Sequence, residues 1–192
     1  VFAQVADEFI ERLRARVGRL RVGPGDTDGV LLGPLHTARG RETIEAQVAD
    51  ALERGAAVLA GARRPAGETL ARGFFYEPTL LLEPAHDARV AREEVFGPVL
   101  PIWRVRDLEE GLKMANRSMY GLGSSVWTRD LDRAAYAAER LEAGYTWINS
   151  PQKIYDELPF GGVKQSGIGK EHGIEALGYY LETKSVVVRR SS

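Results

Sequence analysis

The sequence predicts an α/β protein: a mostly parallel sheet with helices packed on its faces, followed by a C-terminal helix and an extended strand. Two observations predict this class. Helical patterns with a 3.6-residue period alternate along the chain with short apolar runs of strand length, and turn residues such as Gly23–Gly25 separate them. Hydrophobic residues make up 44% of the 192 positions, which is enough to build a core.

The first half of the chain predicts two amphipathic helices and several strands. Apolar residues recur at helical spacing from Ala6 to about Leu20 and again over 38–53, where Gly55 is expected to end the second helix. Strands are expected, in chain order, at 56–60, 74–76, 79–82 and 99–105.

The second half continues the alternation. Asp107 and Asp130 each suit the N-cap of a helix, the first helix running to about residue 117 and the second to about 141. The stretch 120–123 is typical of a turn, and strands are expected at 124–127 and 144–149. Short connections between such units favour parallel neighbours with right-handed crossovers.

The character of the sequence changes after Asn149. An irregular loop is expected at 150–158, glycines crowd 161–173, a helix follows to about Leu181, and residues 183–190 are expected to be extended. We therefore expect an α/β core at 1–149 and an appendage at 150–192. Three consecutive valines in a terminal strand require a pairing partner.

Composition excludes several function classes. The net charge is −1, with basic and acidic residues interspersed, so no nucleic-acid partner is expected. No apolar run approaches the roughly 18 residues of a membrane span, and the N-terminus does not read as a signal peptide, so a cytoplasmic location is expected. There is no cysteine, and His36, His86 and His172 lie far apart, so no metal site is expected.

Three segments carry a family resemblance: Gly73–Thr79, Glu93–Pro98 and Pro159–Gly173. Their order and separation resemble the aldehyde dehydrogenase family over essentially the whole chain, which corresponds to the last part of that family's usual length. The resemblance implies the catalytic-domain fold with a C-terminal oligomerisation strand, and an oxidoreductase that uses NAD or NADP.

The resemblance implies cofactor roles for Glu94 and Phe96. A carboxylate at Glu94 would accept hydrogen bonds from the hydroxyls of the nicotinamide ribose, and Phe96 would offer an apolar face near the nicotinamide ring. The residues alone leave another interpretation open, in which Glu93 and Glu94 are helix-end charges and Phe96 is a core anchor.

The resemblance also implies a substrate channel. Phe160 would form an aromatic wall of the channel, and the loop at 150–158 would help to set substrate preference through Gln152 and Ile154. Lys153, Asp156 and Glu157 are expected to be solvated loop charges. The spacing of glycines over 167–173 does not fit the dinucleotide fingerprint GxGxxG, so no phosphate cradle is expected there.

The catalytic cysteine, the general base and the dinucleotide-binding domain of the family would all lie upstream of this region. No residue of this chain is therefore assigned a catalytic role, and the chain alone is predicted to oxidise no aldehyde. We expect it to associate with further copies or with an upstream dehydrogenase subunit. Two other readings stay open: a naturally short relative that binds or assembles, and a non-redox activity in the surviving pocket.

Overall fold

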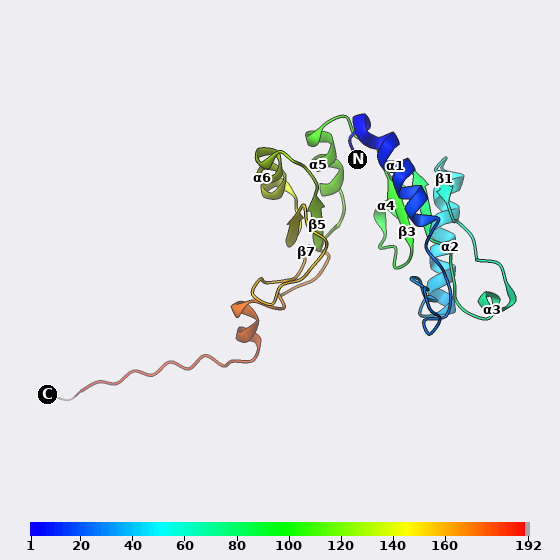
Figure 1. Ribbon diagram of the computed structural model, residues 1–192. Coiled ribbons are helices and arrows are strands. Elements are labelled where there is room, and N and C mark those ends of the chain that lie inside the picture. The colour runs from blue at the N-terminus through cyan, green and yellow to red at the C-terminus, as the bar shows by residue number, and fades with distance from the viewer. Residues whose placement is uncertain (191–192) are drawn as a thin grey trace. The chain divides into compact units, whose positions relative to one another are not determined.

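The computed structural model describes residues 1–190 of the chain (Figure 1). The chain divides into two compact units, unit 1 at Val1–Gly111 and unit 2 at Leu112–Ser192, with the division falling inside helix α5 (Leu108–Asn116). This division lies earlier than the expected change at 149/150. The assignment of separate roles to 1–149 and 150–192 stays a prediction, and residues 191 and 192 lie outside the described part.

Unit 1 is built on a three-stranded sheet in the order β1-β2-β3. The central strand β2 pairs antiparallel with β1 and parallel with β3, and the short helix α4 lies between β2 and β3 in the chain. A short helix therefore connects two parallel strands, at a place where the sequence had predicted no helix. The elements of the unit are α1 (Ala3–Val17), α2 (Ala38–Glu53), β1 (Ala57–Ala60), α3 (Glu68–Ala71), β2 (Thr79–Leu82), α4 (Arg89–Arg92) and β3 (Val99–Ile102).

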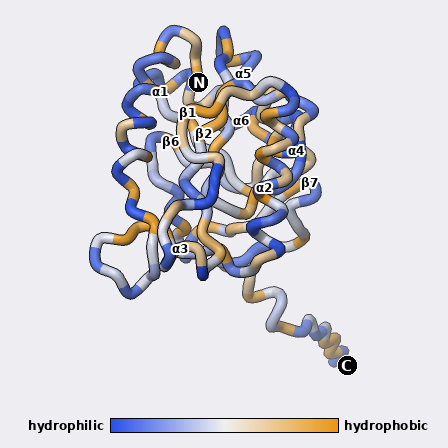
Figure 2. Tube along the Cα trace, turned by 90° about the vertical axis from the view of Figure 1, so that its right-hand side faces the viewer, coloured by the Kyte–Doolittle hydropathy of each residue, from blue (hydrophilic) through white to orange (hydrophobic). Residues whose placement is uncertain are grey.

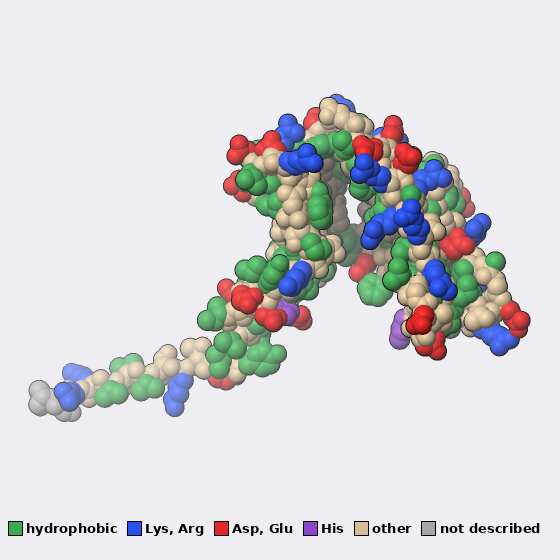
Figure 3. All heavy atoms as spheres, in the orientation of Figure 1, with side chains coloured by type: hydrophobic (Ala, Val, Ile, Leu, Met, Phe, Trp, Pro, Cys, Tyr) green, Lys and Arg blue, Asp and Glu red, His purple; other side chains and the backbone are tan. Residues whose placement is uncertain are grey.

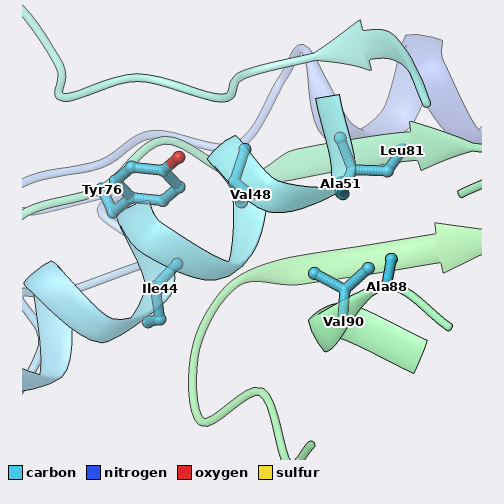
Figure 4. Packing of buried hydrophobic residues seen from close by; sticks show 7 residues of the cluster. All are labelled: Ile44, Val48, Ala51, Tyr76, Leu81, Ala88 and Val90. Carbon is cyan, nitrogen blue, oxygen red and sulfur yellow. The ribbon is translucent and has the colours of Figure 1, made fainter. Parts of the chain in front are cut away.

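Strand β2 is buried on both faces because successive side chains point to opposite sides of a sheet. Leu80 packs with Ala6 and Ile10 of α1, whereas Leu81 packs with residues of α2 and α4. The trace through β2 is accordingly hydrophobic (Figure 2). Burial of each leucine side chain contributes about 1.5–3 kcal/mol to the free energy of folding. The larger of the two clusters is shown in Figure 4 and consists of Ile44, Val48, Ala51, Tyr76, Leu81, Ala88 and Val90.

The ends of α2 follow from local chemistry. The Thr37 hydroxyl accepts a hydrogen bond of 3.0 Å from the backbone N–H of Gly40 and so caps the first turn. Gly55, just past the helix, has φ +92°, a conformation that glycine adopts without strain. The predicted bounds of this helix are confirmed, while α1 begins and ends about three residues earlier than expected.

Unit 2 contains a parallel pair of strands, β5 (Gly123–Val126) and β6 (Tyr145–Ile148), joined through helix α6 (Leu131–Arg140). The Asp130 carboxylate accepts a hydrogen bond of 3.0 Å from the backbone N–H of Arg133, which confirms the predicted N-cap. A second, two-stranded sheet pairs β4 (Tyr120–Gly121) with β7 (Val163–Lys164) in antiparallel register.

The C-terminal part of unit 2 contains little regular structure. The helix expected before Leu181 is a 3₁₀ helix, η1 (Ile174–Tyr179), and it buries none of its residues. Residues 181–190 are all exposed and form no strand with any described residue, so their pairing with a partner stays a prediction. Val186–Val188 are 71%, 94% and 83% exposed, and hydrophobic side chains are visible along this segment in Figure 3.

The α/β class is confirmed, although the sheets are smaller and more mixed than expected. The strand expected at 74–76 does not form, because Phe75 and Tyr76 fill the core from irregular backbone instead. The turn expected at 120–123 is β4 and the start of β5. Within residues 1–190, no helix combines the length and the apolar content needed to cross a membrane.

Candidate functional site

The predicted cofactor segment, Glu93–Pro98, follows α4 in unit 1. Val95 packs against the larger hydrophobic cluster, whereas Glu94 is exposed and Phe96 is 84% exposed. The interpretation of Phe96 as a core anchor is therefore wrong. Glu94 and Phe96, on either side of the partly buried Val95, are therefore both open to solvent.

Helix α2 holds the beginning of this segment. Buried Gln47, 1% exposed, donates from its side-chain nitrogen to the Glu93 carboxylate and to the main-chain carbonyl of Glu94, both at 3.1 Å. Arg89 forms two further hydrogen bonds to the Glu93 carboxylate, at 2.8 and 3.0 Å. Hydrogen bonds from Arg89 and Gln47 lower the pKa of Glu93, so this carboxylate stays ionised and engaged.

Two more contacts join this part of the chain to α2, one at the start of α4 and one at Gly97. The Asp50 carboxylate accepts a hydrogen bond of 2.8 Å from the backbone N–H of Arg89, and this bond, followed by that from Arg54, lowers the pKa of Asp50. At the other end, a β-carbon on Gly97 would clash with the Cδ1 atom of Ile44. Glycine therefore allows the backbone to lie directly on the helix.

The two adjacent glutamates consequently differ in what they can do. The Glu93 carboxylate is occupied by Arg89 and Gln47, which fits its interpretation as a helix-end charge. The Glu94 carboxylate makes no hydrogen bond or ion pair with any residue in the described part of the chain. Glu94 thus presents a free acceptor two residues before the exposed Phe96, on a backbone that contacts α2 at the Glu94 carbonyl and at Gly97.

The predicted substrate side lies in unit 2. Phe160 is half-buried, with its ring centroid 5.8 Å from that of Tyr145, which in turn lies 4.5 Å from Trp147. The backbone of Phe160 exchanges two hydrogen bonds of 2.7 Å with that of Glu171. This pairing folds the glycine-rich segment back on itself and sets Phe160 at the edge of an aromatic cluster.

An open cavity of about 360 Å³ lies beside Phe160. It is lined by Leu122, by residues of 160–171, and by Tyr179 and Tyr180. Gln152 and Ile154 are exposed and do not line it. The structure therefore brings Phe160 to this cavity and leaves the other two predicted substrate residues on the neighbouring loop.

Lys170 organises the glycine-rich backbone, a role that the sequence did not reveal. Its ammonium group donates to the carbonyl of Gly161 at 2.7 Å and to that of Gly162 at 3.3 Å. A β-carbon on Gly144 would clash with the same Gly161 carbonyl, so strand β6 begins in direct contact with this turn. The lysine charge is thus satisfied by main-chain oxygens.

Glu94 and Phe96 belong to unit 1, and Gln152, Ile154 and Phe160 belong to unit 2. Each group is held within its own unit. Across residues 1–190, no group of three histidine, cysteine, aspartate or glutamate side chains is placed to bind a metal ion.

Comparison with known proteins decides the family. A family model described as the aldehyde dehydrogenase family matches residues 1–186. This chain belongs to the aldehyde dehydrogenase family. It is 42% identical over 183 residues to a succinate-semialdehyde dehydrogenase [NADP(+)] of Deinococcus radiodurans, and 38% identical over 182 residues to a betaine aldehyde dehydrogenase of Bacillus subtilis.

These matches cover 95% of this chain and 37% of each of the two aldehyde dehydrogenases. The crystal structure of a betaine aldehyde dehydrogenase of Staphylococcus aureus in complex with NAD+ superimposes with a TM-score of 0.91 at 35% identity, over 96% of this chain and 37% of that one. The chain thus spans little more than a third of the aldehyde dehydrogenases that it matches.

Proposed function

We propose that this chain forms part of the catalytic domain of an NAD(P)-dependent aldehyde dehydrogenase, contributing to the cofactor site and to the substrate channel. One observation carries the proposal furthest: Glu94 presents an unengaged carboxylate two residues before the exposed ring of Phe96. The two adjacent glutamates suit a binding segment, because Glu93 is bonded to Arg89 and Gln47 while the Glu94 carboxylate is available to a ligand.

The residues fit a nicotinamide ribose. An ionised carboxylate accepts hydrogen bonds from vicinal hydroxyls, and such charge-assisted bonds are about twice as strong as neutral ones. Phe96 offers an apolar face that would cover one side of the nicotinamide ring. When bound, NAD or NADP supplies the hydride acceptor, and the residues of this chain hold and orient it.

On the substrate side, Phe160 supplies an aromatic wall, and Gln152 and Ile154 contribute the preference for particular aldehydes. Apolar walls with few polar groups are typical of small-molecule sites. Two of the relatives are described by different aldehydes, succinate semialdehyde and betaine aldehyde, so the substrate class is left at aldehydes.

The 192 residues contain no cysteine, so the thiolate that attacks the aldehyde must come from another polypeptide segment. We therefore expect no aldehyde oxidation by this chain alone, and weak or no binding of the cofactor. The exposed segment at 183–190 is proposed to pair with a strand of another subunit, in a further copy or an upstream dehydrogenase subunit. A cytoplasmic location is part of the same proposal.

A hybrid enzyme tests the proposal. The region of the Deinococcus relative that precedes its match to this chain is joined to residues 1–192, and NADH or NADPH formation is followed with a panel of aldehydes. The hybrid should be active and the 192-residue chain inactive. Turnover by the chain alone, or an inactive hybrid that is folded, would contradict the proposal.

Within the hybrid, Glu94→Gln isolates the cofactor role. Losing the charged acceptor should raise the KM for the cofactor by at least about tenfold, because hydrogen bonds to a charged group contribute about 1.5–3 kcal/mol. Glu11→Gln is the matched control, because Glu11 is exposed on α1 and has no role in the proposed site. An unchanged cofactor KM in Glu94→Gln would remove Glu94 from the site.

A further inference from the structure

The loop at 150–158 has little burial or regular structure of its own to fix its conformation. It contains no helix or strand; Ser150 is half-buried and the other eight residues are exposed. Within the loop itself, backbone hydrogen bonds join Lys153 to Pro151 at 2.7 Å and Leu158 to Tyr155 at 3.2 Å. Two short-range bonds in solvent do not define the path of nine residues, so the contacts from outside the loop decide its order.

One such contact comes from strand β6. The indole nitrogen of Trp147 donates a hydrogen bond of 2.7 Å to the main-chain carbonyl of Lys153. Trp147 is 7% exposed. Its indole group has one N–H donor and no acceptor, so this buried ring can satisfy its polar atom only by donating to an acceptor such as the Lys153 carbonyl.

The Trp147 ring is itself fixed in place. A β-carbon on Gly123 of the neighbouring strand would lie 2.7 Å from the ring, so the indole rests directly on glycine backbone. The ring of Tyr145 packs beside it at 4.5 Å. Because the ring is confined on these sides, the carbonyl of Lys153 is held at a defined point.

A second contact holds the far side of the loop. The carbonyl of Asp156 accepts a hydrogen bond of 2.9 Å from the backbone N–H of Gly173, and its carboxylate lies 3.0 Å from Nδ1 of His172. The charged end of Lys153 lies over the ring of Tyr155, 4.9 Å from the ring centroid. The middle of the loop therefore runs between two fastened points.

From these contacts we infer that Trp147 is a positioning residue that presets the loop at 150–158. Gln152 and Ile154 flank Lys153, so holding the carbonyl of Lys153 fixes the direction in which both side chains are presented. A loop that is ordered in advance does not lose conformational entropy when a ligand binds. The meaning of the loop for aldehyde preference rests on the proposed function, whereas the contact itself does not.

Hydrogen exchange on the 192-residue chain tests the inference. Trp147→Phe keeps an aromatic ring but removes the N–H donor. Loss of one hydrogen bond should speed deuterium uptake of peptides covering 150–158 by about fivefold, while uptake by β5 and β6 stays unchanged. Trp127→Phe is the matched control, because Trp127 is 65% exposed and its indole has no partner among the described residues.

A second measurement needs no variant. In the NMR spectrum of the wild-type chain, the indole protons of Trp147 and Trp103 should exchange slowly, since Trp103 also donates to a carbonyl, that of Pro84 at 2.7 Å. The indole proton of Trp127 should exchange fast. Unchanged uptake at 150–158 in a folded Trp147→Phe chain, or a Trp147 indole proton that exchanges as fast as that of Trp127, would overturn the inference. Neither measurement involves cofactor or aldehyde, so failure here is separate from failure of the proposed function.

Discussion

The side-chain nitrogen of Gln47 donates a hydrogen bond of 3.1 Å to the main-chain carbonyl of Glu94. Gln47→Ala would remove this bond and the one to the Glu93 carboxylate, leave the carbonyl of Glu94 without its side-chain donor and open a cavity, at a cost of about 2–4 kcal/mol in the free energy of unfolding. Chemical denaturation of the variant and the wild type measures this difference in the free energy of unfolding. Gln4→Ala, at an exposed position on α1, should change stability by less than about 0.5 kcal/mol. Equal stabilities of the two variants would contradict the role given to Gln47.

Gly97→Ala tests how closely the cofactor segment lies on α2. The added methyl group would meet the Cδ1 atom of Ile44, which is 1% exposed within the larger hydrophobic cluster, so we expect a loss of about 1–3 kcal/mol. Ile44→Val removes that atom and should cost about 1 kcal/mol alone. The double variant should lose less than the sum of the single losses. Gly25→Ala, with open space around the position, is the control.

Stability at alkaline pH should report on Tyr76. Burial raises the pKa of Tyr76 to about 12, above its ordinary value near 10. The folded chain then holds the phenol proton more tightly than the unfolded chain. This contribution is fully present below pH 10 and is lost as pH rises from about 10 to 12, at a total of about 2–3 kcal/mol. Tyr76→Phe should abolish that loss in denaturation curves, whereas Tyr180→Phe, at an 86% exposed position, should retain it.

Lys170→Met tests the link between the lysine and the glycine-rich turn. The variant keeps much of the side-chain volume but leaves the carbonyls of Gly161 and Gly162 without their charged donor. We expect a loss of about 1–3 kcal/mol and faster hydrogen exchange at 160–171. Lys113→Met is the control, since Lys113 is exposed on α5. If both variants exchange like the wild type, the ammonium group does not organise this turn.

Elements that depend on local sequence signals could be predicted, whereas elements that depend on pairing between distant segments could not. Helix α2 could be bounded from its apolar period and Gly55, because both signals lie within the segment itself. Strand β4 could not be found, since a two-residue strand shows no period and its partner Val163–Lys164 lies far along the chain. The 3₁₀ helix η1 replaces the expected helix because it contains Gly178 and buries no side chain that would stabilise an α-helix.

The same limit applies to the site. Glu94 and Phe96 were identified through family resemblance, and their cofactor roles stay predictions. Gln47 carried a signal that could have revealed it: a polar residue stands at a buried position between Ile44 and Val48 on the stripe of α2. Trp147 carried none, because the carbonyl it binds belongs to a loop whose path depends on tertiary contacts.

The parallel pairing of β5 and β6 has a further consequence through Gly123. In the observed register Gly123 stands opposite Tyr145 and leaves room for the ring of Trp147. A slip of one residue would place Ser124 under the indole, where its β-carbon would displace the ring and break the pairing of the Ser124 and Thr146 hydroxyls at 2.8 Å. Gly123 therefore favours one register of β5 and β6. Through the position of Trp147 in that register, it also influences the path of the loop at 150–158.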